Sequence, residues 1–130
     1  MDALNKFAPN AHWLLRLALI GPFAFHGLGK FMMPAAGAEM LGLPVAIIIL
    51  VGIVEVGGSL ILLAGSKAKD WMVRLTGLGF TGTMIGAIIM FHAPNGWSSL
   101  FGANGMEFQV TLTLVSLYFV VVGNQAEVED

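Results

Sequence analysis

The apolar residues of this chain stand in four long blocks, at residues 12–33, 43–65, 71–92 and 104–123. The blocks do not alternate apolar with polar positions as a half-buried strand does, and they lack the polar face of a surface helix. Each is about 20 residues long, the length that an α-helix needs to cross a hydrocarbon core about 30 Å thick. We therefore predict an all-α membrane protein, a bundle of four transmembrane helices that forms a single domain over residues 1–130.

The composition supports a membrane protein and excludes several other classes. Charged residues make up 11% of the chain and hydrophobic residues 57%, whereas an average soluble domain is about 25% charged. The chain has no cysteine, which excludes disulfides, thiolate nucleophiles and thiolate metal sites. A net charge of −2 offers no basic surface to a phosphate backbone, so we expect the lipid bilayer as a partner and no nucleic acid.

The basic residues predict how the bundle is oriented. If the four helices cross alternately, one side of the membrane holds most of the lysines and arginines, and the other side holds only Lys30. The basic side contains Lys6, Arg16, Lys67, Lys69 and Arg74. The positive-inside rule places that side, with both termini, in the cytoplasm. The first block also resembles a signal peptide, but its length and its three ionisable residues favour a permanent helix.

Ionisable side chains inside the blocks are the candidate functional residues. A charge at the middle of a bilayer costs about 2.5–3.5 kcal/mol, so Glu55, near the centre of the second block, must be protonated or paired with a group from another helix. His26 and Lys30 are four residues apart and share one face of the first helix. His92 ends the third block and Glu107 lies near the start of the fourth. The four helices therefore bring these five groups to the outer half of the bundle, where they can form a polar pocket.

Each candidate also has a purely structural interpretation. Arg16, Arg74 and Lys30 can extend to lipid headgroups. His92 and Glu107 can be solvated helix ends. The whole set can also be a polar network that fixes the register of the helices.

Three further interpretations concern the same helices. His26 can be a neutral core histidine bonded to a carbonyl that Pro22 frees. Metal binding is disfavoured, because no single helix carries a Glu/His pair three or four residues apart. Gly82 and Gly86 have the small-xxx-small spacing that lets two helices approach closely.

At these positions the sequence resembles the DoxX family. The resemblance lies in an ordered series of motifs over residues 11–123. In residues 14–31 the arginine, the His-Gly pair and the lysine stand where the family has them. The remaining motifs are Gly-Leu-Pro at 42–44, Val-Gly-Ile-Val-Glu-Val-Gly-Gly at 51–58, His-Ala-Pro-Asn-Gly-Trp at 92–97 and Asn-Gly-Met-Glu-Phe at 104–108.

The resemblance implies a small multi-pass protein of the bacterial inner membrane that is linked to redox metabolism. One related branch forms the membrane part of thiosulfate:quinone oxidoreductase, and other members act with soluble sulfurtransferase or superoxide dismutase partners. The leading hypothesis is a quinone-interacting subunit without a covalent cofactor. Its catalytic residues would be Glu55 and His26, and its ligand-binding residues Arg16, Lys30, His92 and Glu107.

Two other classes of function remain open. The chain can be a non-catalytic anchor or assembly subunit that docks a soluble or membrane redox protein through its outer loops or through the glycines of the third helix. It can also be a carrier or channel, which would require a homo-oligomer because four short spans make a narrow bundle.

Overall fold

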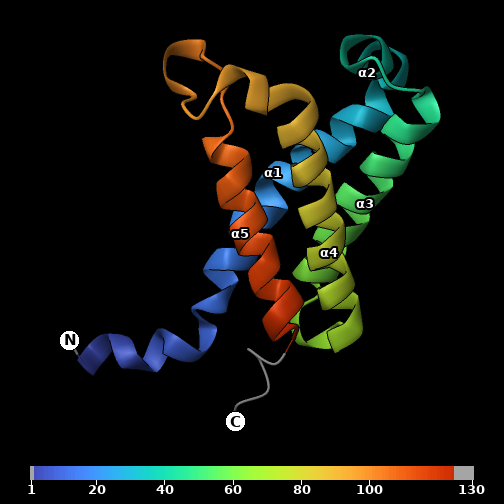
Figure 1. Cartoon of the computed structure of the whole chain (residues 1–130). Coiled ribbons are helices and arrows are strands. Elements are labelled where there is room, and N and C mark those ends of the chain that lie inside the picture. Colours follow the sequence, from blue (N-terminus) through green and yellow to red (C-terminus); the bar gives the residue numbers. More distant parts are fainter. Residues whose placement is uncertain (1, 125–130) are drawn as a thin grey trace.

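The computed structural model describes residues 2–124, and every regular element in that range is a helix (Figure 1). The all-α class predicted from the sequence is therefore confirmed for this part of the chain. The α-helices are α1 (His12–Met32), α2 (Pro34–Leu41), α3 (Val45–Leu63), α4 (Asp70–Ala87) and α5 (Glu107–Val122). Short 3₁₀ segments are η1 (Asp2–Asn10), η2 (Gly65–Lys67), η4 (Ala93–Asn95) and η5 (Leu100–Gly102), and η3 (Ile88–His92) is a π-helix that continues α4.

The four long helices pack in the order α1, α3, α4, α5, with additional contact between α1 and α5. The start of α1 and the end of α5 lie at one end of the bundle, and α2 lies at the other end, as do the segments that join α4 to α5 (Figure 1). η1 turns away from the bundle at the start of α1. We call the end that holds α2 and η3 the cavity end, and the opposite end the terminal end.

Within residues 2–124, two helices are long and apolar enough to cross a membrane. These are α3, with a mean hydropathy of 2.6, and the continuous helix Asp70–Asn95, with a mean hydropathy of 1.4. Only 33% of the first and 28% of the second is buried inside the protein. Their remaining apolar surface needs a non-aqueous environment. α5 is apolar but has 16 residues, which cover only about 24 Å.

The segment between α1 and α3 differs from the sequence-based expectation. Residues 34–42 lie between the first two apolar blocks, where no helix was predicted, but Pro34–Leu41 form helix α2. Met33 breaks the helical path with φ −138° and ψ 61°, and Pro34 occupies the first turn of α2, where its missing N–H has no cost. Gly42 ends α2 in the left-handed conformation, with φ 64°.

Contacts between helices depend on an aromatic stack and on two glycines. Phe23 of α1 and Phe80 of α4 stack with ring centroids 3.7 Å apart and an interplanar angle of 10°. A Cβ atom at Gly27 would lie 2.9 Å from the Cβ of Glu55, and one at Gly77 would lie 2.8 Å from the backbone oxygen of Ser116. These glycines therefore allow α1 to approach α3 and α4 to approach α5.

The glycine pair singled out from the sequence has a different position. A Cβ at Gly82 or Gly86 would meet nothing within 4 Å, so neither residue mediates a close helix contact within the chain. Both line a cavity instead. The close contact between α4 and α5 lies at Gly77 instead, so the close approach expected at Gly82 and Gly86 does not occur within the described residues.

Candidate functional site

A cavity of about 370 Å³ lies between α1, α3, α4, η3 and α5 at the cavity end of the bundle. Its walls are mainly apolar and include Phe23, Ile48, Met84, Phe91 and Leu112. The polar side chains in the wall are His26, Lys30, Glu55, Thr83, His92 and Gln109. Four of these six were candidates from the sequence, and the helices bring those four together around one space.

The strongest interaction in the wall is an ion pair between two helices. Lys30 of α1 donates a hydrogen bond from Nζ to Oε2 of Glu55 on α3, over 2.7 Å. The Glu55 side chain is 3% exposed and the Lys30 side chain 19% exposed. The expectation that Glu55 pairs with a group from another helix is thus confirmed. The pairing depends on Gly27, whose lack of a side chain lets α1 lie directly against Glu55.

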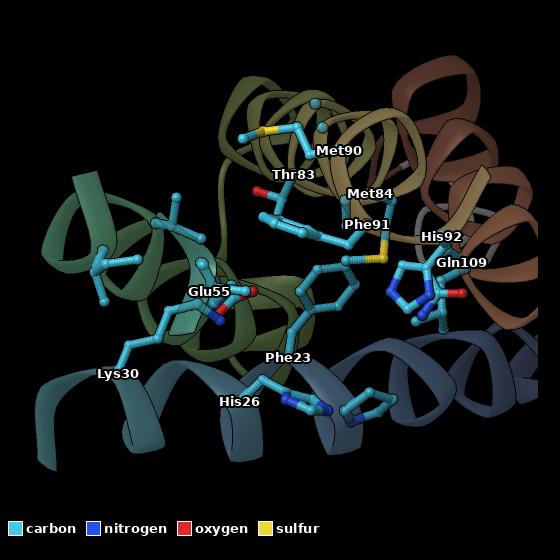
Figure 2. A pocket seen from close by; sticks show the side chains of 18 of the residues that line it. Phe23, His26, Lys30, Glu55, Thr83, Met84, Met90, Phe91, His92 and Gln109 are labelled. Atoms are coloured by element: carbon cyan, nitrogen blue, oxygen red, sulfur yellow. The ribbon is translucent and has the colours of Figure 1, made fainter. Parts of the chain in front are cut away.

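His26 lies one turn before Lys30 on α1 and also lines the cavity (Figure 2). Its ring is exposed and contacts Phe25 edge to face, with centroids 5.7 Å apart. It makes no hydrogen bond with any residue in the range 2–124. The interpretation of His26 as a core histidine bonded to a backbone carbonyl is therefore wrong, because α1 turns this side chain outward at the edge of the cavity.

The opposite wall is formed by α4, η3 and α5. His92, the last residue of the π-helix, places Nδ1 3.0 Å from the carbonyl oxygen of Asn104. A carbonyl can only accept, so Nδ1 carries the proton. Thr83 donates its hydroxyl proton to the carbonyl of Gly79 over 3.0 Å. Gln109 has a buried Oε1 that accepts no hydrogen bond from residues 2–124.

Thr83 and Gln109 are the cavity residues that sequence reasoning missed. Both side chains are uncharged, whereas all candidates from the sequence were ionisable residues. An amide within an apolar block is nevertheless a detectable signal, because a buried polar group costs free energy unless it finds a partner.

Glu107 and Arg16 do not line the cavity. Glu107 accepts a hydrogen bond at Oε1 from the backbone N–H of Ser99 over 2.8 Å, so it holds the loop between η4 and α5. Its place in the first turn of α5 also suits the positive end of the helix dipole. The structure therefore separates Glu107 from the other candidates at this end of the bundle.

Arg16 lies at the terminal end and is completely buried. Its Nη1 donates to the carbonyl of Leu62 over 2.9 Å, and its Nη2 donates to Oδ1 of Asn124 over 2.5 Å. Asn124 in turn donates from Nδ2 to the carbonyls of Gly65 and Ala68. The prediction that Arg16 extends to lipid headgroups is wrong, because the side chain satisfies backbone and amide oxygens where α1, α3 and α5 meet.

Arg74 of α4 likewise donates hydrogen bonds to backbone carbonyls of another helix. It forms an ion pair with Asp70 over 2.7 Å and donates to the carbonyls of Val120 and Val121, at the end of α5. The last carbonyls of a helix lack partners within the helix, and a cation there is also favoured by the helix dipole. We call Arg16, Asp70, Arg74 and Asn124 the terminal clasp.

A comparison with protein families identifies the architecture. The model of the DoxX family matches residues 11–93, which extend from the start of α1 through η3. The chain belongs to the DoxX family. It is a membrane protein of that family. The match is shorter than the resemblance over residues 11–123, since the motif at 104–108 and helix α5 lie outside it. No curated protein shows a significant match to the chain. No solved structure does so either.

In this DoxX protein the family match contains most of the cavity's polar groups, but Gln109 lies outside it. Within residues 2–124 no group of three or more histidine or acidic side chains is placed to hold a metal ion. The ionisable side chains of the cavity wall, His26, Lys30, Glu55 and His92, can offer hydrogen bonds and charge to a ligand.

Proposed function

We propose that this DoxX protein is a redox-associated membrane subunit that binds quinone, or another small apolar ligand with a polar head, in the cavity between its helices. The observation that carries the proposal is a buried ion pair, Lys30–Glu55, in the wall of an otherwise apolar cavity. A volume of about 370 Å³ falls within the range of about 300–1,000 Å³ that small-molecule sites occupy.

The polar groups of the cavity wall suit both ligand binding and proton transfer. Lys30 uses one N–H on Glu55, and its two other N–H groups have no partner among residues 2–124, so they are available to a ligand oxygen. Glu55 can take up or release a proton beside that oxygen. His26, exposed at the edge of the cavity, can pass the proton onward. In this scheme Glu55 and His26 are the catalytic residues, and Lys30 and His92 bind the ligand.

We also propose four membrane crossings, by α1, α3, the α4–η3 helix and α5, in the bacterial inner membrane. Both termini would be cytoplasmic, because the basic residues gather at the terminal end, where α1 begins and α5 ends. The cavity then faces the outer leaflet, from which an apolar ligand can enter between the helices.

A binding experiment with matched carboxylate variants tests the proposal. A short-chain benzoquinone is titrated into detergent-purified protein, with tryptophan fluorescence as the readout. Glu55→Gln should weaken binding by about tenfold or more, since it removes a charge-assisted contact. Glu107→Gln, the same change in a carboxylate outside the cavity, should leave binding unchanged.

A second variant tests the location without touching a polar group. Gly86 lines the cavity, and a Cβ there meets nothing within 4 Å, so Gly86→Leu should fold and fill the ligand space. Quinone binding should then be lost. If quinone titrates equally well into wild type, Glu55→Gln and Gly86→Leu, the proposed site is rejected.

One observation favours a docking role as the second candidate. The loop between η4 and α5 exposes three large apolar side chains, Trp97, Leu100 and Phe101. Phe101 is held at φ 53°, a left-handed conformation that bulky residues rarely adopt. An anchor subunit could present this loop to a redox protein. Asn tolerates the same backbone conformation, so Phe101→Asn should fold and abolish co-purification of a stoichiometric partner, whereas Glu55→Gln should retain it.

A further inference from the structure

The two polar ends of the cavity offer different hydrogen-bonding groups. In Figure 2 Lys30 and Glu55 lie on one side of Phe23, and His92 and Gln109 lie on the other. The first end has the two unused N–H donors of Lys30 and the carboxylate of Glu55, which accepts hydrogen bonds. The second end can be assigned atom by atom from the bonds that its side chains already make.

Two side-chain protons are already committed, one on His92 at the second end and one on Thr83, which lies between the two ends in Figure 2. Nδ1–H of His92 points to the carbonyl of Asn104, so the other ring nitrogen, Nε2, is left as an acceptor. The hydroxyl proton of Thr83 points to the carbonyl of Gly79, so its oxygen retains only lone pairs for a ligand.

The second end has one further buried acceptor atom, on Gln109. Oε1 of Gln109 is buried and receives no hydrogen bond within the described part of the chain. Buried polar atoms in folded proteins nearly always have a partner, and leaving one without a partner costs free energy. An acceptor of this kind in a cavity wall indicates that the missing donor belongs to the molecule that fills the cavity.

We propose that the site selects a ligand carrying a hydroxyl group, and so binds the hydroquinone form of its ligand in preference to the quinone. This inference rests on the proposed quinone-binding function. A quinone carbonyl has no proton to give to Oε1 of Gln109 or Nε2 of His92, whereas a phenolic O–H donates to either. At the other end a hydroxyl can accept from Lys30 and donate to Glu55, whereas a carbonyl can only accept.

The test compares three probes of nearly the same shape on the native protein. A decyl-substituted 1,4-benzoquinone, its hydroquinone kept reduced under anaerobic conditions, and the dimethyl ether of that hydroquinone are titrated separately into detergent-purified protein. The hydroquinone should bind about tenfold or more tightly than the other two, because only it carries donors. Equal affinity for all three probes overturns the inference but leaves quinone binding intact. If none of the three binds, the proposed function itself fails.

Variants on α5 locate the preference. Gln109→Met keeps the length of the side chain and removes the acceptor, so the affinities for hydroquinone and quinone should come within about threefold of each other. Thr111→Val, on an exposed part of the same helix outside the cavity wall, should keep the full preference. A preference that persists unchanged in a folded Gln109→Met protein refutes the assignment to Gln109.

Discussion

Removing the charge of Lys30 is expected to destabilise this protein far more than removing the charge of its partner Glu55. The reason lies in the exposure of the two side chains, 19% for Lys30 and 3% for Glu55. Lys30→Met keeps the apolar stem but leaves a carboxylate buried without a counter-charge. Breaking a buried pair in this way costs about 3–5 kcal/mol, and we expect the lower end, about 3 kcal/mol, because the cavity adjoins the pair.

Glu55→Gln should cost less, about 1 kcal/mol, since the amide oxygen still accepts from Lys30 and the less buried ammonium can turn toward the cavity. The double variant leaves one neutral amide in place of the ion pair, and replacing both members of a buried pair is often close to neutral. We expect the double variant to be destabilised by about 1–2 kcal/mol. The two single changes sum to about 4 kcal/mol, so the coupling free energy is about 2–3 kcal/mol.

The assay is reversible unfolding in mixed micelles, with the fraction of denaturing detergent as the variable and far-UV circular dichroism as the readout. Lys69→Met and Glu39→Gln repeat the two changes at exposed positions and should leave the unfolding curve in place. If Lys30→Met costs less than about 1 kcal/mol, or if the two single changes add without coupling, the ion pair does not hold α1 against α3 as described.

The same assay tests three other features of the packing. Gly27→Ala should destabilise the protein by about 1–3 kcal/mol by overpacking α1 against α3. Gly29→Ala, where a Cβ meets nothing within 4 Å, should be neutral or stabilising by up to about 1 kcal/mol. Equal effects of the two variants would contradict the close approach of α1 to α3. Arg16→Met should cost about 3 kcal/mol or more, because buried acceptors lose charged donors, and an unfolding curve left in place, as for Lys69→Met, would disprove the clasp. Gly42→Ala should cost about 1 kcal/mol through its left-handed backbone, and an unchanged unfolding midpoint would argue against α2 ending there.

The sequence predicted the positions of the long helices well, since the length of an apolar block alone decides them. α1 begins at His12 and ends at Met32, against an expected range of 12–33, and α3 extends over Val45–Leu63, against 43–65. α2 was not predicted, although the sequence carries its signals, Pro34 at its start and Gly42 after its end. The π-helix was not predictable, because a change of hydrogen-bond register leaves no mark on hydropathy.

The candidate site was predictable only in part, for two physical reasons. The energetic cost of a charge in hydrocarbon correctly indicated that Glu55 needs a partner, and helical periodicity put Lys30 within reach. The positions of charged residues in the sequence do not tell how each helix is rotated about its own axis. The rotation of each helix decides that His92 faces the cavity while Glu107 holds a loop, and that Gln109 brings an unpaired acceptor into the wall.

The two ends of the bundle divide stability and ligand binding between them. At the terminal end the clasp ties α1, α3, α4 and α5 through side chains that satisfy helix-end carbonyls. At the cavity end the ion pair Lys30–Glu55 is the one side-chain hydrogen bond between long helices within residues 2–124, so this end has fewer constraints on its spacing. Ligand entry requires the helices to separate where the constraints are fewest. Because the clasp lies outside the cavity wall, its loss should lower the free energy of unfolding while the protein that remains folded keeps its affinity for the ligand.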